Sequence, residues 1–276
     1  MKFPLTIKKT GAIEMTANFR TTIVIAACLH LAAAGAGLAY QKEAGPVKEC
    51  SACHSLDREK AAKLLQKLGS KVVDVGPGPF PGTWEVDVEK DGKRYPLYLD
   101  YSGKYLFNGQ VIRLRDMENL SSLRYIDLNR VDVSAIPLDD AIVLGNPGAK
   151  RRVIVFDDPD CAWCRKLHGE IKQIVASDPE VAFFVRVYSR NNNPASVRKA
   201  LSIVCGKKEA ANRLDDAFAG KKLPDPDCRS DSVEVTAKLA RELGIQGTPA
   251  LVFPDGKLVS GYMPADALRK LIRGEK

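Results

Sequence analysis

The sequence lacks two features that mark common functional classes. Across its 276 residues no cluster of lysine and arginine is interleaved with aromatic side chains, so the formal net charge of +8 indicates a solvated surface rather than a nucleic-acid partner. A long leucine-rich run is also missing. The longest apolar stretch, residues 21–38, is rich in alanine and glycine and only approaches the length that spans a bilayer. These absences argue against a nucleic-acid-binding protein and against an integral membrane protein.

Residues 1–39 have the features of a cleaved secretory signal peptide. The apolar run follows a basic segment, and Gly37-Leu38-Ala39 supplies a small-x-small cleavage signal; the basic residues are Lys2, Lys8, Lys9 and Arg20. We therefore predict cleavage after Ala39 and a periplasmic location. Two alternatives stay open. In the first, the apolar run is retained as a membrane anchor. In the second, Cys28 is lipidated as in a lipoprotein, but the apolar sequence continues beyond Cys28, which argues against lipidation.

Six cysteines follow this leader, and they fall into three pairs: Cys50/Cys53, Cys161/Cys164 and Cys205/Cys228. Export places them in an oxidising compartment, where disulfides persist. An even count, with two close pairs and one wide pair, is typical of a secreted redox protein.

The pair Cys161/Cys164 has the sequence context of thiol chemistry. A β-branched stretch, residues 152–156, is followed by a short acidic turn, and Cys-Ala-Trp-Cys then opens an amphipathic helix. The free N–H groups and partial positive charge of a helix N-terminus stabilise a thiolate, the species that attacks disulfides. We predict that Cys161 is the nucleophile and that Cys164, one turn on, closes a disulfide with it. The alternatives are a structural disulfide and half of a zinc site.

The region before this motif is predicted to form a small α+β unit and a linker. After an N-terminal extension, residues 40–55, the unit spans residues 56–117 and the linker residues 118–149. The unit combines an amphipathic helix with a meander sheet: helix 57–68 ended by Gly69, Gly/Pro-rich loop 76–82, strand 84–89, hairpin turn Asp91-Gly92 and strand 95–100. The linker carries a charged helix over residues 118–129.

Residues 150–276 are predicted to form a second unit with alternating strands and helices. The order is strand, helix, strand, a helical region over about 195–243, two strands and a final helix. This order is that of a thioredoxin fold with a helical insertion.

Several motifs resemble the periplasmic disulfide isomerases of the DsbC/DsbG family. They are Phe156-Asp157, Cys161-Ala-Trp-Cys164, Lys166-Leu-His168, Gly244–Ala250 and Leu258–Tyr262. The resemblance implies an α+β cystatin-like dimerisation domain, joined by a helical linker to an α/β thioredoxin-fold catalytic domain with a helical insertion.

The same resemblance implies an enzyme that isomerises or reduces incorrect disulfides in misfolded exported proteins. It further implies a homodimer, a membrane thiol reductase as electron donor, and no cofactor for the thiol chemistry. The middle residues Ala162-Trp163 differ from the commoner pairs in the family. Since this dipeptide influences the redox potential, the balance between isomerase and reductase stays open.

Further site residues are assigned by the same resemblance. Pro249 matches a cis-proline that faces the cysteine pair, and Thr248 would offer its backbone to a bound peptide strand. Cys205 and Cys228 match a structural disulfide, which should stabilise the fold by about 3 kcal/mol. His168, four residues after Cys164, either tunes the thiolate or is a surface or packing residue.

Cys50-Ser-Ala-Cys53-His54 departs from the family pattern and matches c-type haem attachment. Few sixth ligands are available beyond the leader: Met117, Met263 and His168. The alternatives are a disulfide between Cys50 and Cys53, and a zinc site with its fourth position unfilled. One other function stays open because of this motif: an electron-transfer protein with haem c at Cys50/Cys53/His54. A second, independent of the motif, is a non-enzymatic periplasmic chaperone.

Overall fold

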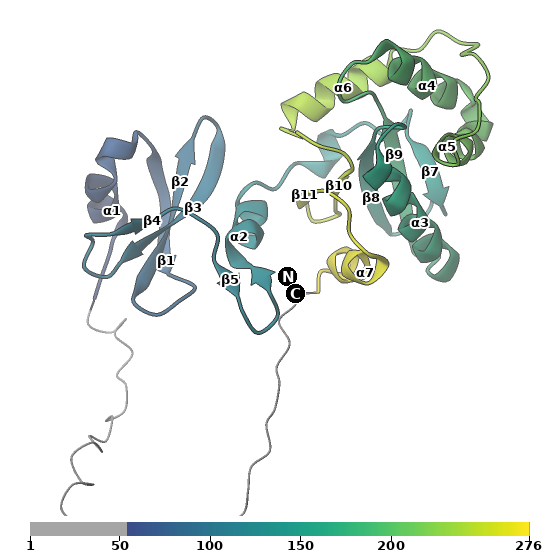
Figure 1. The fold of residues 1–276 in the computed structure, drawn as a ribbon. Helices are drawn as coiled ribbons and strands as arrows, with labels where there is room; N and C mark the ends of the chain where they lie inside the picture. Colours follow the sequence, from purple (N-terminus) through teal and green to yellow (C-terminus); the bar gives the residue numbers. More distant parts are fainter. Residues whose placement is uncertain (1–53, 276) are drawn as a thin grey trace, which may run out of the picture. The chain divides into compact units, whose positions relative to one another are not determined.

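The computed structural model describes residues 54–275 (Figure 1). The predicted signal peptide, the alternative lipidation at Cys28, and the pair Cys50/Cys53 lie outside the described residues. Within 54–275, no helix combines the length and the apolar character needed to cross a bilayer.

The first unit is a helix on a four-stranded antiparallel sheet. The strand order is β1-β2-β3-β4, and the elements are α1 (Arg58–Leu64), the 3₁₀ turn η2 (Gln66–Leu68), β1 (Lys71–Pro77), β2 (Thr83–Lys90), β3 (Lys93–Asp100) and β4 (Leu106–Phe107). Asp57 caps α1 by accepting a hydrogen bond from Lys60 N at 2.8 Å. The predicted hairpin turn is confirmed, because Asp91 and Gly92 both have positive φ, as a two-residue hairpin loop requires.

A small apolar core holds this unit together. Its buried members come from α1 with its C-cap residue and from one face of the sheet: Ala61, Leu65, Val86, Val88, Leu97 and Leu99. Strand β1 was not predicted, and its first five residues precede the expected Gly/Pro loop. It is an edge strand of half-buried and exposed residues, so its sequence carries no clear alternation.

The helix that we placed in the linker packs on this first unit. It is α2 (Leu120–Leu128), preceded by the short hairpin β5 (Ile112–Arg113) and β6 (Glu118–Asn119). The Ser121 hydroxyl lies 2.8 Å from the Tyr98 hydroxyl of β3, and Arg124 forms an ion pair with the buried Asp87 of β2. The charged side chain of Arg124 therefore binds the sheet, so this helix is part of the first unit and not of a free linker.

The second unit is built on a five-stranded mixed sheet with the order β11-β10-β8-β9-β7. Its strands are β7 (Ile142–Gly145), β8 (Arg151–Asp157), β9 (Val181–Val187), β10 (Ala250–Val252) and β11 (Leu258–Ser260). Strands β8 and β9 are parallel, and β7 and β10 flank them in antiparallel pairing. The predicted start at residue 150 is wrong, because β7 is an edge strand of this sheet. Four residues are too few to show a periodic pattern.

The helices cover the sheet in the predicted order. They are α3 (Ala162–Ser177), α4 (Pro194–Cys205), the 3₁₀ turn η4 (Lys207–Glu209), α5 (Ala210–Phe218), α6 (Ser232–Glu242) and α7 (Ala265–Arg273). Helix α3 packs against α7, whereas α4 and α6 contact each other and β9 (Figure 1). The predicted fold class, an α+β unit followed by an α/β unit with a helical insertion, is confirmed.

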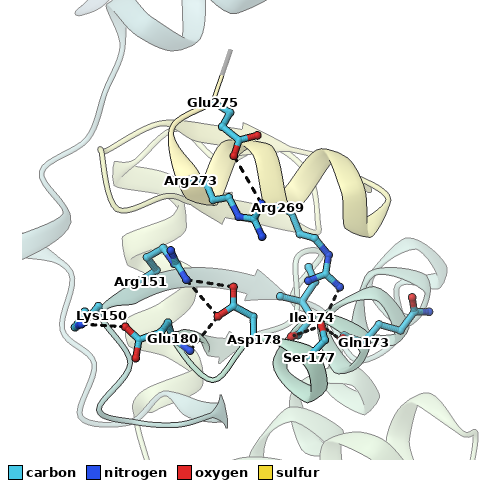
Figure 2. A network of polar contacts seen from close by, with 10 residues as sticks. All are labelled: Lys150, Arg151, Gln173, Ile174, Ser177, Asp178, Glu180, Arg269, Arg273 and Glu275. Atoms are coloured by element: carbon cyan, nitrogen blue, oxygen red, sulfur yellow. Dashed lines mark hydrogen bonds and ion pairs between the residues drawn. The ribbon is translucent and has the colours of Figure 1, made fainter.

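A polar network fixes the C-terminal end of α3 (Figure 2). Arg151, at the start of β8, donates to both carboxylate oxygens of Asp178 at 3.2 Å, and Arg269 of α7 donates to the Ser177 hydroxyl at 3.0 Å. The end of α3 remote from the cysteines is thereby tied to both the sheet and α7.

Candidate active site

Cys161 is the N-cap of α3, at the point where β8 has ended and the helix begins. Its sulfur accepts a hydrogen bond from Cys164 N at 3.4 Å, and its own N–H donates to Asp158 O at 3.0 Å. Cys161 is half-buried and Cys164 is fully buried, and both are free thiols. The structure therefore places the two sulfurs at the helix N-terminus, with only the first facing the surface.

The cis-peptide Thr248–Pro249 lies against the Cys161 sulfur. The thiol donates to Thr248 O at 3.3 Å. Strand β10 is antiparallel to β8, with Ala250 opposite Phe156, so the start of β10 meets the end of β8. Sheet topology thus brings together Cys161, Cys164, Thr248 and Pro249, which are 84 or more residues apart across the two segments in the sequence.

Beneath this pair lies Asp157, a buried carboxyl whose role the sequence did not reveal. It is the last residue of β8, it is fully buried, and neither oxygen has a conventional hydrogen-bond partner among residues 54–275. Burial raises the pKa of Asp157 to about 7; interaction with the Cys164 thiol opposes this shift, and the charge of Asp158 adds to it. An acidic residue ending an apolar strand just before Cys-x-x-Cys was the available signal.

The two cysteines experience different electrostatics. Burial, followed by the negative charge of Asp157, raises the pKa of the Cys164 thiol well above its ordinary value. Cys161 is instead half-buried, and its sulfur receives a backbone N–H at the helix N-terminus. Cys161 is therefore suited to attack, whereas Cys164 keeps its proton until a base takes it.

Asp158 and Asp160 hold the turn that carries Cys161. Asp158 accepts hydrogen bonds from Arg190 N at 2.8 Å, Ser196 Oγ at 3.2 Å and Asp160 N at 2.9 Å. Asp160 also forms an ion pair with Lys199 of α4. The acidic turn thus fixes the helix N-terminus against the insertion.

The remaining residues that the sequence singled out lie apart from this pair. Cys205 and Cys228 form a disulfide with an S–S distance of 2.04 Å, which joins the end of α4 to the segment before α6. The His168 ring contacts Asp215 at 2.5 Å and packs on Phe218 of α5 at 5.1 Å between ring centroids. These contacts are those of a packing residue.

His54 is the one member of the Cys-x-x-Cys-His motif that the structure describes. It is exposed, and its ring stacks on Tyr101 with centroids 5.1 Å apart. Among residues 54–275, no group of three or more His, Cys, Asp or Glu side chains is arranged to hold a metal ion. Cys50 and Cys53 are outside the described residues.

Replacing Asp157 with Asn should change the pH dependence of stability. The carboxyl titrates near 3.8 in the unfolded chain and near 7 in the folded protein, so between these values the folded state holds a proton that the unfolded chain has lost. The wild-type free energy of unfolding should therefore fall as pH rises through this window, by about 1.4 kcal/mol per pH unit at most.

Urea unfolding at pH 4, 6 and 8 measures this effect. We expect Asp157→Asn to be more stable relative to wild type at pH 8 than at pH 4, whereas the exposed-site control Asp227→Asn should follow wild type. A difference between Asp157→Asn and wild type that is the same at all three pH values would contradict this assignment.

Two family models match the chain. The model of the disulfide bond isomerase protein N-terminal domain matches residues 52–122, and the model of the thioredoxin-like domain matches residues 138–274. The second match includes β7, which supports placing that strand in the second unit.

Relatives match most of the length of the chain. It is 26% identical over 210 residues to the thiol:disulfide interchange protein DsbC of Escherichia coli (strain K12), covering 76% of this chain and 85% of that protein. It is 28% identical over 211 residues to the probable thiol:disulfide interchange protein DsbC of Bordetella parapertussis, covering 76% and 71%. A crystal structure of a disulfide interchange protein from Neisseria gonorrhoeae is 32% identical, and the match covers 51% of this chain and 98% of that one, with a TM-score of 0.44.

Because both domains occur in order and the matched relatives cover about three quarters of the sequence, the chain belongs to the DsbC family of thiol:disulfide interchange enzymes.

Proposed function

We propose that this protein is a periplasmic enzyme that isomerises incorrect disulfides in exported proteins through Cys161 and Cys164. The observation that carries the proposal is the contrast between the two sulfurs. Cys161 lies half-buried at the N-terminus of α3 beside Thr248 O, and Cys164 is buried against Asp157.

In the first step the Cys161 thiolate attacks one sulfur of a client disulfide. A bond forms between Cys161 Sγ and that sulfur, the client S–S bond breaks, and the second client sulfur leaves as a thiolate. The backbone of Thr248, adjacent to the reacting sulfur, is placed to pair with an extended client segment.

The mixed disulfide then has two fates. In isomerisation another client thiolate attacks the client sulfur and releases Cys161 as a thiolate, so the enzyme gains and loses no electrons. In reduction Cys164 attacks Cys161 Sγ, which oxidises the enzyme pair and reduces the client by two electrons. The second fate makes the enzyme dependent on an external dithiol donor, which we propose to be a membrane thiol reductase.

The position of Asp157 bears on the balance between these fates. Cys164 must lose its proton before it attacks, and both burial and the charge of Asp157 raise its pKa. The Asp157 carboxylate, with a pKa of about 7, is the group placed to accept that proton near neutral pH. The transfer moves the negative charge from the carboxylate to a buried thiol that is the weaker acid, so it is unfavourable. Release by Cys164 is therefore slowed, and the client has time to rearrange.

We also propose that the protein acts as a homodimer joined through the first unit. Large apolar side chains are exposed around β4 and the β5–β6 hairpin: Tyr105, Phe107, Ile112, Leu114 and Met117. Leu114 is 81% exposed and Met117 70% exposed. Strand β4 is also the open edge of its sheet. An exposed apolar patch beside an open edge is the surface that a second copy of the chain would cover.

Replacing Cys161 and Cys164 separately should distinguish the two fates. Cys161→Ser should abolish rescue of a scrambled multi-disulfide client, because the attacking sulfur is gone. Cys164→Ser should still form the mixed disulfide but lose net reduction of the client. Recovery of client activity and the client's free thiol content measure the two outcomes. If Cys161→Ala/Cys164→Ala suppressed client aggregation as well as wild type, and wild type rescued the scrambled client no better than this variant, the protein would instead be a non-enzymatic chaperone.

Adding charge to the proposed dimer surface should produce monomers. Leu114→Glu/Met117→Glu would place two carboxylates in an apolar contact, so we expect the mass from light scattering to fall to that of one chain. Leu64→Glu, an exposed apolar site on α1, is the matched control and should leave the mass unchanged. A wild-type protein that is monomeric at micromolar concentration would contradict the dimer.

The state of Cys50 and Cys53 can be read from the intact mass of the exported protein after alkylation, with and without prior reduction. We expect both to be alkylated only after reduction, as a disulfide, because the exposed His54 ring is stacked on Tyr101. A haem-sized adduct that survives reduction would instead make His54 an iron ligand and favour electron transfer. Alkylation made possible by a chelator alone would indicate zinc.

A further inference from the structure

An exposed aromatic cluster lies beside Cys161, and the thiol chemistry does not require it. Trp163, in the first turn of α3, is 57% exposed, and its ring centroid is 5.8 Å from that of Tyr262. The Lys166 ammonium lies 4.1 Å from the Tyr262 centroid and 5.6 Å from the Trp163 ring. Two rings and one cation therefore form a single surface at the mouth of the site.

The Tyr262 ring is held in a fixed position. Its hydroxyl donates to Glu170 Oε1 at 2.7 Å, and Glu170 Oε2 accepts from Ala265 N, at the start of α7, at 3.1 Å. The preceding residue, Gly261, donates its N–H to Pro249 O at 2.7 Å. Tyr262 is thus anchored to α3, to α7 and to the cis-proline, so it presents a rigid support to Trp163.

The exposure of Trp163 distinguishes it from a packing residue. Tryptophan is usually well buried, and a side chain with more than half of its surface exposed contributes little to the core. Lys166 has no carboxylate partner among residues 54–275, and its ammonium is attracted instead to the ring faces. Rigid aromatic side chains supported in this way are typical of recognition sites.

We propose that Trp163, supported by Tyr262 and Lys166, binds an aromatic or large aliphatic side chain next to the cysteine that Cys161 attacks. The inference rests on the proposed function and narrows its substrate class. The bound group must be a client side chain, because Trp163 adjoins the site where Cys161 attacks the client. A client sulfur at Cys161 requires the adjoining client residues to pass over the surface beside it, and Trp163 lies only two residues from Cys161.

The chemistry of the clients fits this surface. Incorrect disulfides occur in chains that have not buried their apolar side chains, so such side chains are available near the cysteines. Offset stacking or an apolar contact on the indole should favour these segments roughly threefold to tenfold over polar ones.

Two synthetic peptides test the proposal. Each carries one cysteine as a mixed disulfide with 5-thio-2-nitrobenzoate, flanked in one peptide by Phe and Leu and in the other by Ser and Gln. Attack by reduced Cys161 forms the enzyme–peptide disulfide and releases the coloured thiolate, which gives the second-order rate constant. The readout is the ratio of the two rate constants, because substitutions between the cysteines also change the reactivity of the sulfur itself.

We expect wild type to react roughly threefold to tenfold faster with the apolar peptide. Trp163→Ser should bring the ratio close to one, Trp163→Phe should keep most of it, and Tyr262→Ala should reduce it. Ellman's reagent, which has no peptide, serves as the chemical control. Equal ratios for wild type and Trp163→Ser would overturn the recognition role while leaving the thiol chemistry intact. Equal rates with Ellman's reagent for reduced wild type and reduced Cys161→Ser would overturn the proposed function, and this inference with it.

Discussion

The site depends on the unequal solvation of two sulfurs on one helical turn. Cys161 caps α3 and accepts a backbone N–H, whereas Cys164 points into the protein, where burial and Asp157 disfavour its thiolate. An exposed helix end stabilises negative charge, and a buried carboxyl opposes it. The pair therefore combines one accessible sulfur at the helix end with one buried thiol that holds its proton more tightly, which suits stepwise disulfide exchange.

This arrangement exists because α3 is fixed at both ends. At the N-terminal end Asp158 binds the backbone of the turn and the start of α4, and at the C-terminal end Asp178 and Ser177 are held by arginines of β8 and α7 (Figure 2). The buried strands β8 and β9 set the position of the whole helix. Small shifts of α3 would alter the 3.3 Å contact between Cys161 and Thr248, so the packing of the domain defines the reactive geometry.

Much of the fold could be predicted because its signals are local. Asp91-Gly92 encodes a hairpin turn, and a β-branched strand before Cys-x-x-Cys encodes the strand–helix junction. Strands β1 and β7 were missed because they are edge strands, one irregular in its burial and the other only four residues long. Asp157 was missed as a site residue for a different reason. The local sequence places a carboxyl just before Cys-x-x-Cys, but the pKa of that carboxyl depends on desolvation by side chains distant in sequence.

Residue 163 lies between the two cysteines, but its side chain faces the client surface and does not supply the hydrogen bond to the Cys161 sulfur. The hydrogen bond that reaches the Cys161 sulfur comes from the backbone of Cys164, and it survives any side chain at position 163 that keeps the helix. The indole of Trp163 instead faces outward onto Tyr262. A change at this position therefore alters the surface that a client meets while leaving the main-chain donor to the thiolate in place.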